Sequence, residues 1–81
     1  MSADAVDRSA AGLVAFMARA IVTEPDAVEV TEVDGGAVVE LLTAPSDRGR
    51  VIGRQGRVAK AMRAVLAASR HGGGARLEIV D

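Results

Sequence analysis

Apolar side chains recur every three or four residues through the first quarter of the chain, the spacing of one face of an amphipathic helix. These side chains are Val6, Ala10, Leu13, Val14, Met17 and Ile21. The pattern predicts a helix from about Asp4 to Val22, with two alternative N-caps: Asp4, followed by Asp7 in the first turn, or Ser9 if the first turns fray. The helix should end before Pro25, because the residue preceding a proline is disfavoured in helical geometry.

Two short β-branched and apolar runs follow, one on each side of Asp34–Gly36. The first run contains Val28, Val30 and Val33, and the second contains Val38, Val39, Leu41 and Leu42. An Asp-Gly-Gly turn between such runs predicts a β-hairpin. Residues 45 to 47, Pro-Ser-Asp, then introduce a short helix that ends at Gly53, with Ser46 or Asp47 as its cap.

The chain after position 56 contains the best-defined amphipathic helix. One face carries Val58, Met62, Val65, Leu66 and Ser69, and another carries Arg57, Lys60 and Arg63. His71–Gly74 should end this helix as a flexible loop, and Ala75, Leu77 and Ile79 alternate with charged residues as in a strand. The predicted order is therefore αββααβ, an α+β fold.

Length and composition limit the classes of protein that remain. The 81 residues allow one domain, and the absence of cysteine excludes disulfides and thiolate metal sites. The amino end lacks the basic and apolar regions of a signal peptide, and no apolar run is long enough to cross a membrane. These features predict a cytoplasmic protein.

The charge distribution is more informative than the net charge of −1. Residues 1 to 47 carry nine acids against two arginines, a net charge of −7, whereas residues 48 to 76 carry eight basic residues and no acid. Such asymmetry is typical of a phosphate-binding face beside an acidic remainder. The alternative is a solvated helix surface whose many arginines reflect a GC-rich genome.

The loop Gly53, Arg54, Gln55 and Gly56 is the strongest candidate for function. Two glycines three residues apart permit positive φ angles and let a nucleic-acid phosphate approach the main chain closely. The basic helix begins directly after this Gly-x-x-G loop, and helix N-termini attract anions.

Enzymatic sites fit the sequence poorly. His71, the single histidine, adjoins three glycines and is expected to be a solvated loop residue rather than a catalytic base. The acids are scattered, which argues against a metal site, and the glycine spacing around Gly53 matches neither of the common nucleotide-binding loops. Phe16, the single aromatic residue, is expected in the core, so no aromatic platform for stacking bases is predicted. We therefore expect no catalysis, no cofactor and no metal.

The run Val-Ile-Gly-Arg-Gln-Gly-Arg-Val-Ala-Lys-Ala-Met-Arg and the element order resemble a type II KH domain, specifically the small bacterial single-domain RNA-binding proteins of the KhpA family. The resemblance covers about Leu13 to Val80. It implies a three-stranded sheet with helices packed on one face. Residues 12–81 would then be the KH domain, and residues 1–11 a flexible lead or the start of the first helix.

The resemblance also implies an RNA-binding site. Gly53, Arg54, Gln55 and Gly56 would clamp the backbone of about four single-stranded nucleotides. The remaining site residues would be Arg57, Lys60, Val51, Ile52 and Arg50. Val51 and Ile52 would contribute to the apolar floor of a groove with Val39 to Leu41 as its other wall, although for each of the two core packing is the stronger expectation. Ala59 stands where many KH domains carry a bulky aliphatic residue, and Val58 and Met62 are expected to supply that packing. Arg50, Arg63 and Arg70 are ambiguous between RNA contact and solvated surface.

A protein-interaction module is the second hypothesis, because a domain with a thin core gains stability from a partner. The KhpA resemblance implies homodimers, and heterodimers with a larger KhpB or Jag-type KH protein, acting as an RNA chaperone linked to cell-wall synthesis and cell shape. The intact Gly-x-x-G loop with basic neighbours favours RNA as the primary partner.

Overall fold

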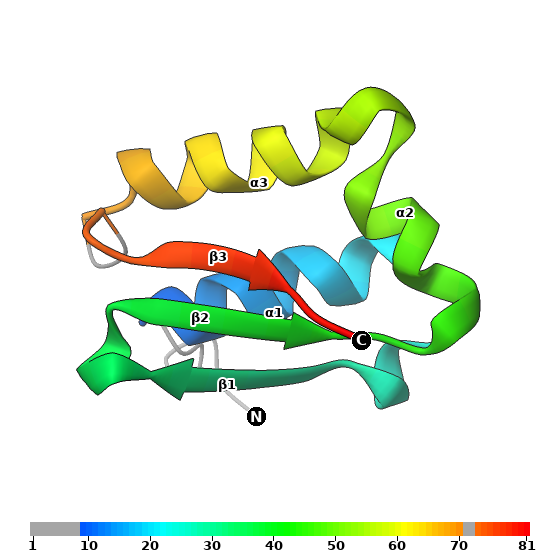
Figure 1. Cartoon of the computed structure of the whole chain (residues 1–81), viewed down its shortest axis with the longest axis horizontal. Helices are drawn as coiled ribbons and strands as arrows, with labels where there is room; N and C mark the ends of the chain where they lie inside the picture. Colours follow the sequence, from blue (N-terminus) through cyan, green and yellow to red (C-terminus); the bar gives the residue numbers. More distant parts are fainter. Residues whose placement is uncertain (1–8, 71–72) are drawn as a thin grey trace, which may run out of the picture.

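Three α-helices and three strands follow one another in the predicted order in the computed structural model, which describes residues 9–70 and 73–81 (Figure 1). The elements are α1 (Ala10–Ile21), β1 (Glu29–Val33), β2 (Val38–Leu42), α2 (Arg48–Ile52), α3 (Arg57–Ala68) and β3 (Arg76–Ile79). Single 3-10 turns precede or join them at Pro25–Ala27, Asp34–Gly36, Pro45–Asp47 and Arg54–Gly56. Within these residues, no helix has the length and apolar character needed to span a bilayer.

Helix α1 begins at the second of the two expected caps. The Ser9 side chain accepts a hydrogen bond of 3.0 Å from the amide of Gly12, which satisfies one of the free donors of the first turn. The alternative cap Asp4 and its neighbour Asp7 lie outside the described residues, as does most of the 1–11 segment.

The sheet has the strand order β1-β2-β3. Strands β1 and β2 form the expected antiparallel hairpin, in which Val33 pairs with Val38 around the turn. Asp34, Gly35 and Gly36 all adopt positive φ there, which explains the residue types of that turn. Strand β3 pairs with β2 in parallel, and a parallel pair needs a long crossover connection, which α2 and α3 provide.

The core lies on one side of the sheet, between the strands and the helices (Figure 1). Helix α1 lies behind the sheet in this view and contacts β1 and β2, and α3 packs on α1 and α2 and runs beside β3. The core consists of Ala10, Val14, Ala18, Val28, Val39, Leu41, Val51, Met62, Leu66 and Leu77. The arrangement agrees with the α+β class and with helices packed on one face, as predicted.

Candidate nucleic-acid interface

The Gly-x-x-G loop is a tight turn between α2 and α3 with three residues at positive φ: Gly53 at 77°, Gln55 at 58° and Gly56 at 75°. A Cβ atom at position 53 would lie 2.7 Å from the Val58 amide nitrogen, and closer still to Val58 Cγ2. No atom lies within 4 Å of a Cβ placed on Gly56. Gly53 is therefore required for packing as well as for its backbone conformation, whereas Gly56 is required for conformation alone.

Backbone hydrogen bonds hold the turn closed. The amide of Gly53 donates to the Gly49 carbonyl at 2.8 Å, and the amide of Gly56 donates to the Gly53 carbonyl at 3.1 Å. Neither bond uses the amides of Arg54 and Gln55. The 12-residue helix α3 starts immediately after the turn, so its positive dipole end adjoins these amides.

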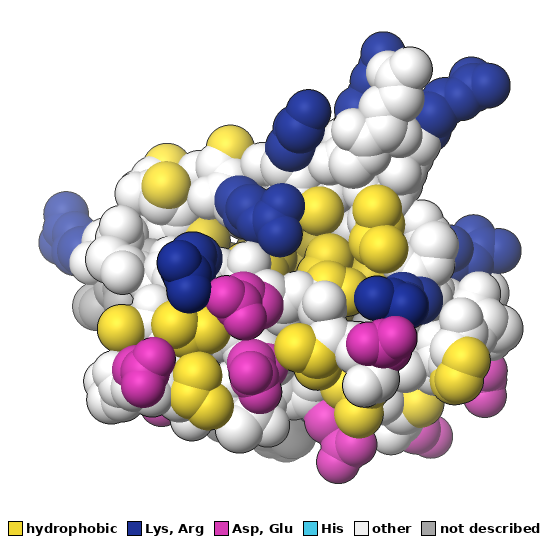
Figure 2. All heavy atoms as spheres, viewed as in Figure 1, with side chains coloured by type: hydrophobic (Ala, Val, Ile, Leu, Met, Phe, Trp, Pro, Cys, Tyr) yellow, Lys and Arg dark blue, Asp and Glu magenta, His cyan; other side chains and the backbone are white. Residues whose placement is uncertain are grey.

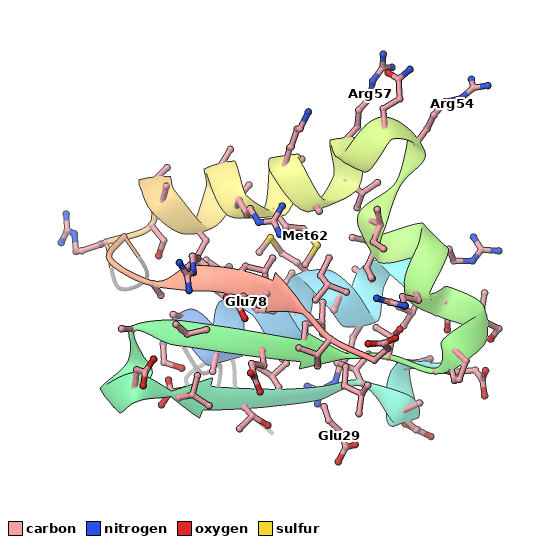
Figure 3. The ribbon with its side chains drawn as sticks, viewed as in Figure 1. Glu29, Arg54, Arg57, Met62 and Glu78 are labelled. Carbon is pink, nitrogen blue, oxygen red and sulfur yellow. The ribbon has the colours of Figure 1, made fainter. Side chains whose placement is uncertain are left out.

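Arg54, Gln55, Arg57 and Lys60 are all exposed around this turn. Arg54 and Arg57 point away from the body of the domain (Figure 3), and Arg57 Nη2 lies 3.3 Å from Gln55 Oε1, to which it donates. In Figure 2 most basic side chains lie over the loop and α3, and the acidic ones lie over the sheet, where some basic side chains adjoin them. Glu29 lies on the opposite side of the view from Arg54 and Arg57 (Figure 3). The charge asymmetry of the sequence is therefore also an asymmetry in space.

Several other basic residues of the 48–76 segment are bound to acceptors of the domain itself. Arg48 forms an ion pair of 3.0 Å with Asp81, and Arg76 forms one of 3.0 Å with Glu78. Arg63 Nε donates to the Leu77 carbonyl at 3.2 Å and so joins α3 to β3. No such ion pair engages Arg54, Arg57 or Lys60 in the part of the chain that the structure describes. The concentration of unpaired charge lies at the loop, rather than along the whole segment.

The two apolar residues before the loop have different environments. Val51 is fully buried, which confirms the stronger of its two expectations, packing in the core. Ile52 is half-buried at the end of α2. Val51 thus supports the loop from within. Met62 is in the core and Val58 packs against it, as expected, and Ala59 is itself buried.

The prediction that Val39 to Leu41 form the second wall of the groove was wrong. Val39 and Leu41 are fully buried, and their strand β2 is the middle strand of the sheet. The parallel pairing of β3 with β2 inserts β3 between β2 and α3, so β3 forms the edge that faces the loop and α3 (Figure 1). Apolar side chains are visible in the recess below the loop in Figure 2, and Met62 points into the space between α3 and the sheet in Figure 3.

Asp47 has a role that sequence reasoning missed. Its carboxylate accepts hydrogen bonds from the Thr23 amide (2.9 Å), the Thr23 hydroxyl (2.9 Å) and the Glu24 amide (3.0 Å), although the side chain is completely buried. The Thr23 amide bond is the main cause of a lowered pKa of Asp47, and burial opposes it. Of the two expected caps of α2, Ser46 and Asp47, it is Asp47 that occupies the N-cap position. Its carboxylate does not bind the amides of α2 but those of the segment after α1.

A second surface departs from expectation. Phe16 is 66% exposed and Val65 is 48% exposed, where both were expected to pack inside. Helix α1 buries Ala10, Val14 and Ala18, spaced by four, and Phe16 lies midway between two of them in sequence and hence on another face. The two side chains flank an apolar groove between α1 and α3 whose other lining residues are Met17, Ala20, Ile21, Val58, Ala61 and Met62.

Within residues 9–70 and 73–81, no three His, Cys, Asp or Glu side chains are placed to hold a metal ion. His71 lies outside the described residues. The exposed loop with its basic residues is the main candidate for ligand binding because of its charge and its exposure.

Along most of its length the chain is similar to a family of KH-domain proteins. The family model of the KhpA/KhpB KH domain matches residues 11–80. The RNA-binding protein KhpA of Caldanaerobacter subterraneus is 49% identical over 59 residues, 70% of this chain and 79% of that protein. The RNA-binding proteins KhpA of Treponema pallidum and Halalkalibacterium halodurans are 44% and 47% identical over 73 residues, 85% of this chain and 91% and 96% of theirs. No solved structure was found to match the chain.

Proposed function

Because this chain belongs to the KhpA/KhpB KH-domain family, we propose that it binds single-stranded RNA, without catalysis, through the loop Gly53–Gly56 and the first turn of α3. The observation that best supports this proposal is the turn itself. Three residues at positive φ turn the chain sharply, and exposed Arg54 and Arg57 flank the turn at a helix N-terminus. This arrangement suits a sugar-phosphate backbone.

The residues around the loop have different roles in this proposal, according to their positions. The amides of Arg54 and Gln55, with the positive end of α3, attract a phosphate, and Arg54, Arg57 and Lys60 add charge-assisted contacts. Arg50, on α2, extends the basic surface. Ile52 contributes apolar surface next to Gly53, and Val51 keeps α2 in place from the core.

Bases would lie in the shallow recess between the loop, α3 and β3. The recess offers apolar contact and the edge of β3, and Phe16 lies elsewhere, between α1 and α3. Because phosphate contacts fix position but carry no sequence information, we expect modest sequence preference and strongly salt-dependent affinity.

Fluorescence anisotropy of a short unstructured RNA, at low and moderate salt, tests the proposal. The double variant Arg54→Asp with Gln55→Asp should lose the salt-sensitive signal while circular dichroism shows the same fold. Equal binding by parent and variant, or no binding by either, would remove the loop mechanism for the isolated domain.

The apolar groove between α1 and α3 supports a second function, pairing with another copy of this chain. Exposed Phe16 adjoins a groove with an entirely apolar lining, so a two-fold pair would bury the aromatic ring of each copy against the groove of the other. The family also suggests a heterodimer with a KhpB or Jag-type KH protein. A cytoplasmic role of such a pair as an RNA chaperone, linked to cell-wall and cell-shape regulation, is part of the same proposal.

A further inference from the structure

We propose that Asp47 is a positioning residue for RNA binding, which fixes α2 and orients the guanidinium group of Arg50; its RNA part rests on the function proposed above. Burial of the Asp47 carboxylate is the first observation behind this proposal. A fully buried carboxylate is unfavourable unless hydrogen bonds compensate, and here two amides and one hydroxyl donate to it. All three donors belong to Thr23 and Glu24, in the segment that follows α1.

The carboxylate acts at the start of the helix that leads to the loop. Helix α2 has only five residues, Arg48–Ile52, so its own hydrogen bonds cannot hold it in place. Asp47 anchors its N-terminal end to Thr23 and Glu24, and Gly53 follows its C-terminal end with a φ of 77°. Asp47 therefore helps to set the position of the loop relative to α1, together with the core packing of Val51.

Asp47 also contacts the exposed side chain of Arg50. Arg50 Nε lies 3.5 Å from Asp47 Oδ1, and the Arg50 side chain is 57% exposed. The contact engages Nε and leaves the two Nη groups of the guanidinium fork for an external anion such as a phosphate. Asp47 thus links a buried anchor to an exposed cation that lies three residues before the loop.

The chain contains a matched control. Arg48 lies on the same short helix and also forms an ion pair, but with Asp81 and not with Asp47. A loss of charge at Arg48 tests the general effect of removing one arginine from α2, and a loss of charge at Arg50 tests the geometry that Asp47 imposes.

A double-mutant cycle on RNA affinity tests the proposal, with the fold of each variant checked by circular dichroism. Arg50→Ala should weaken binding of a short unstructured RNA about three- to tenfold in the parent, and should have little effect in an Asp47→Asn background. Arg48→Ala should change affinity by the same factor in both backgrounds. If Arg50→Ala weakens binding equally in both backgrounds, or not at all in the parent, the positioning role is wrong. If Asp47→Asn does not fold, Thr23→Val, which removes one of the three hydrogen bonds, replaces it and should reduce the effect of Arg50→Ala in part.

A second readout needs no RNA. In nitrogen-15 relaxation measurements, the Arg50 Nε–H group should be ordered in the parent and mobile in Asp47→Asn, with the Arg48 Nε–H group unchanged. Equal mobility of Arg50 in both proteins would overturn the proposal even if RNA binds. Absence of RNA binding by the parent would overturn the proposed function, whereas this measurement reports on Asp47 independently.

Discussion

Gly53 and Val58 approach each other so closely that no side chain fits between them: a Cβ on Gly53 would lie 2.7 Å from the Val58 amide nitrogen. Gly56, at the other end of the loop, has the same positive φ but no atom within 4 Å of its Cβ position. The two glycines of the motif therefore answer to different physical constraints, although they are indistinguishable in the sequence.

Substitution of each glycine by alanine should separate these constraints. Gly56→Ala introduces only an unfavourable backbone conformation and should cost about 1 kcal/mol of the free energy of unfolding. Gly53→Ala adds a steric overlap with Val58 and should cost about 2 to 4 kcal/mol in total. Urea denaturation of both variants checks this order. Equal losses for the two variants would mean that α3 shifts freely away from the loop.

Removal of the charge of Arg57, next to the loop, should weaken RNA binding more than removal of the charge of Arg76, which is paired on the sheet. Arg57→Ala should lower affinity several-fold and reduce the slope of log affinity against log salt by about 1. Arg76→Ala is the matched control, because it removes the same charge from a residue that already pairs with Glu78 on β3. A salt titration of anisotropy measures both. A larger loss of affinity in Arg76→Ala than in Arg57→Ala would indicate that RNA binds at the sheet and not at the loop.

A charge in the apolar groove should prevent pairing of the chain. Val65→Glu places a carboxylate in the lining between α1 and α3 and should convert a dimer to a monomer in sedimentation velocity experiments. Ala67→Glu adds the same charge to another exposed position of α3, outside that lining, and should leave the dimer intact. A parent protein that is monomeric at all concentrations tested would contradict the pairing proposal.

The hydrogen bonds to Asp47 should make stability sensitive to acid. The pKa of Asp47 is lowered in the folded protein relative to the ordinary value of 3.8, so its contribution is present above that value and is lost as the pH falls through the lower, folded pKa. The stability difference between the parent and Asp47→Asn should therefore be constant near neutral pH and should shrink as the pH drops below 3.8. Urea denaturation between pH 7 and about pH 2.5 tests this expectation. A stability difference between the two proteins that shrinks well above pH 3.8 would contradict this expectation.

The local elements were readable from the sequence because each one has a local cause. The hairpin follows from Asp34–Gly36, whose residues all adopt positive φ, and the start of α3 follows from the glycines of the loop. The identity of the loop as the candidate site was readable for the same reason, since motif and helix are contiguous. The packing of the helices on one face of the sheet, by contrast, was implied by the resemblance to the KhpA family.

The errors concern contacts between distant parts of the chain. Asp47 resembles an ordinary helix cap in the sequence, and nothing near it indicates that its partners are Thr23 and Glu24, more than 20 residues away. Periodicity showed that Phe16 lies on a helix but not whether an element covers its face. The parallel register of β3, which displaced the expected wall of the groove, likewise depends on a crossover rather than on local pattern.

That parallel pairing also has a consequence for the order of folding. Val38 and Arg76 are neighbours in the sheet, and α2, the Gly-x-x-G loop and α3 all lie in the chain between them. Because closing so long a connection costs entropy before any contact is gained, β3 should join the sheet late and limit the folding rate. The binding loop lies within the connection that this pairing closes, and detachment of β3 would free one end of that connection while β2 stays paired with β1. We therefore expect the sheet edge that faces the loop to be the last part of the binding surface to form.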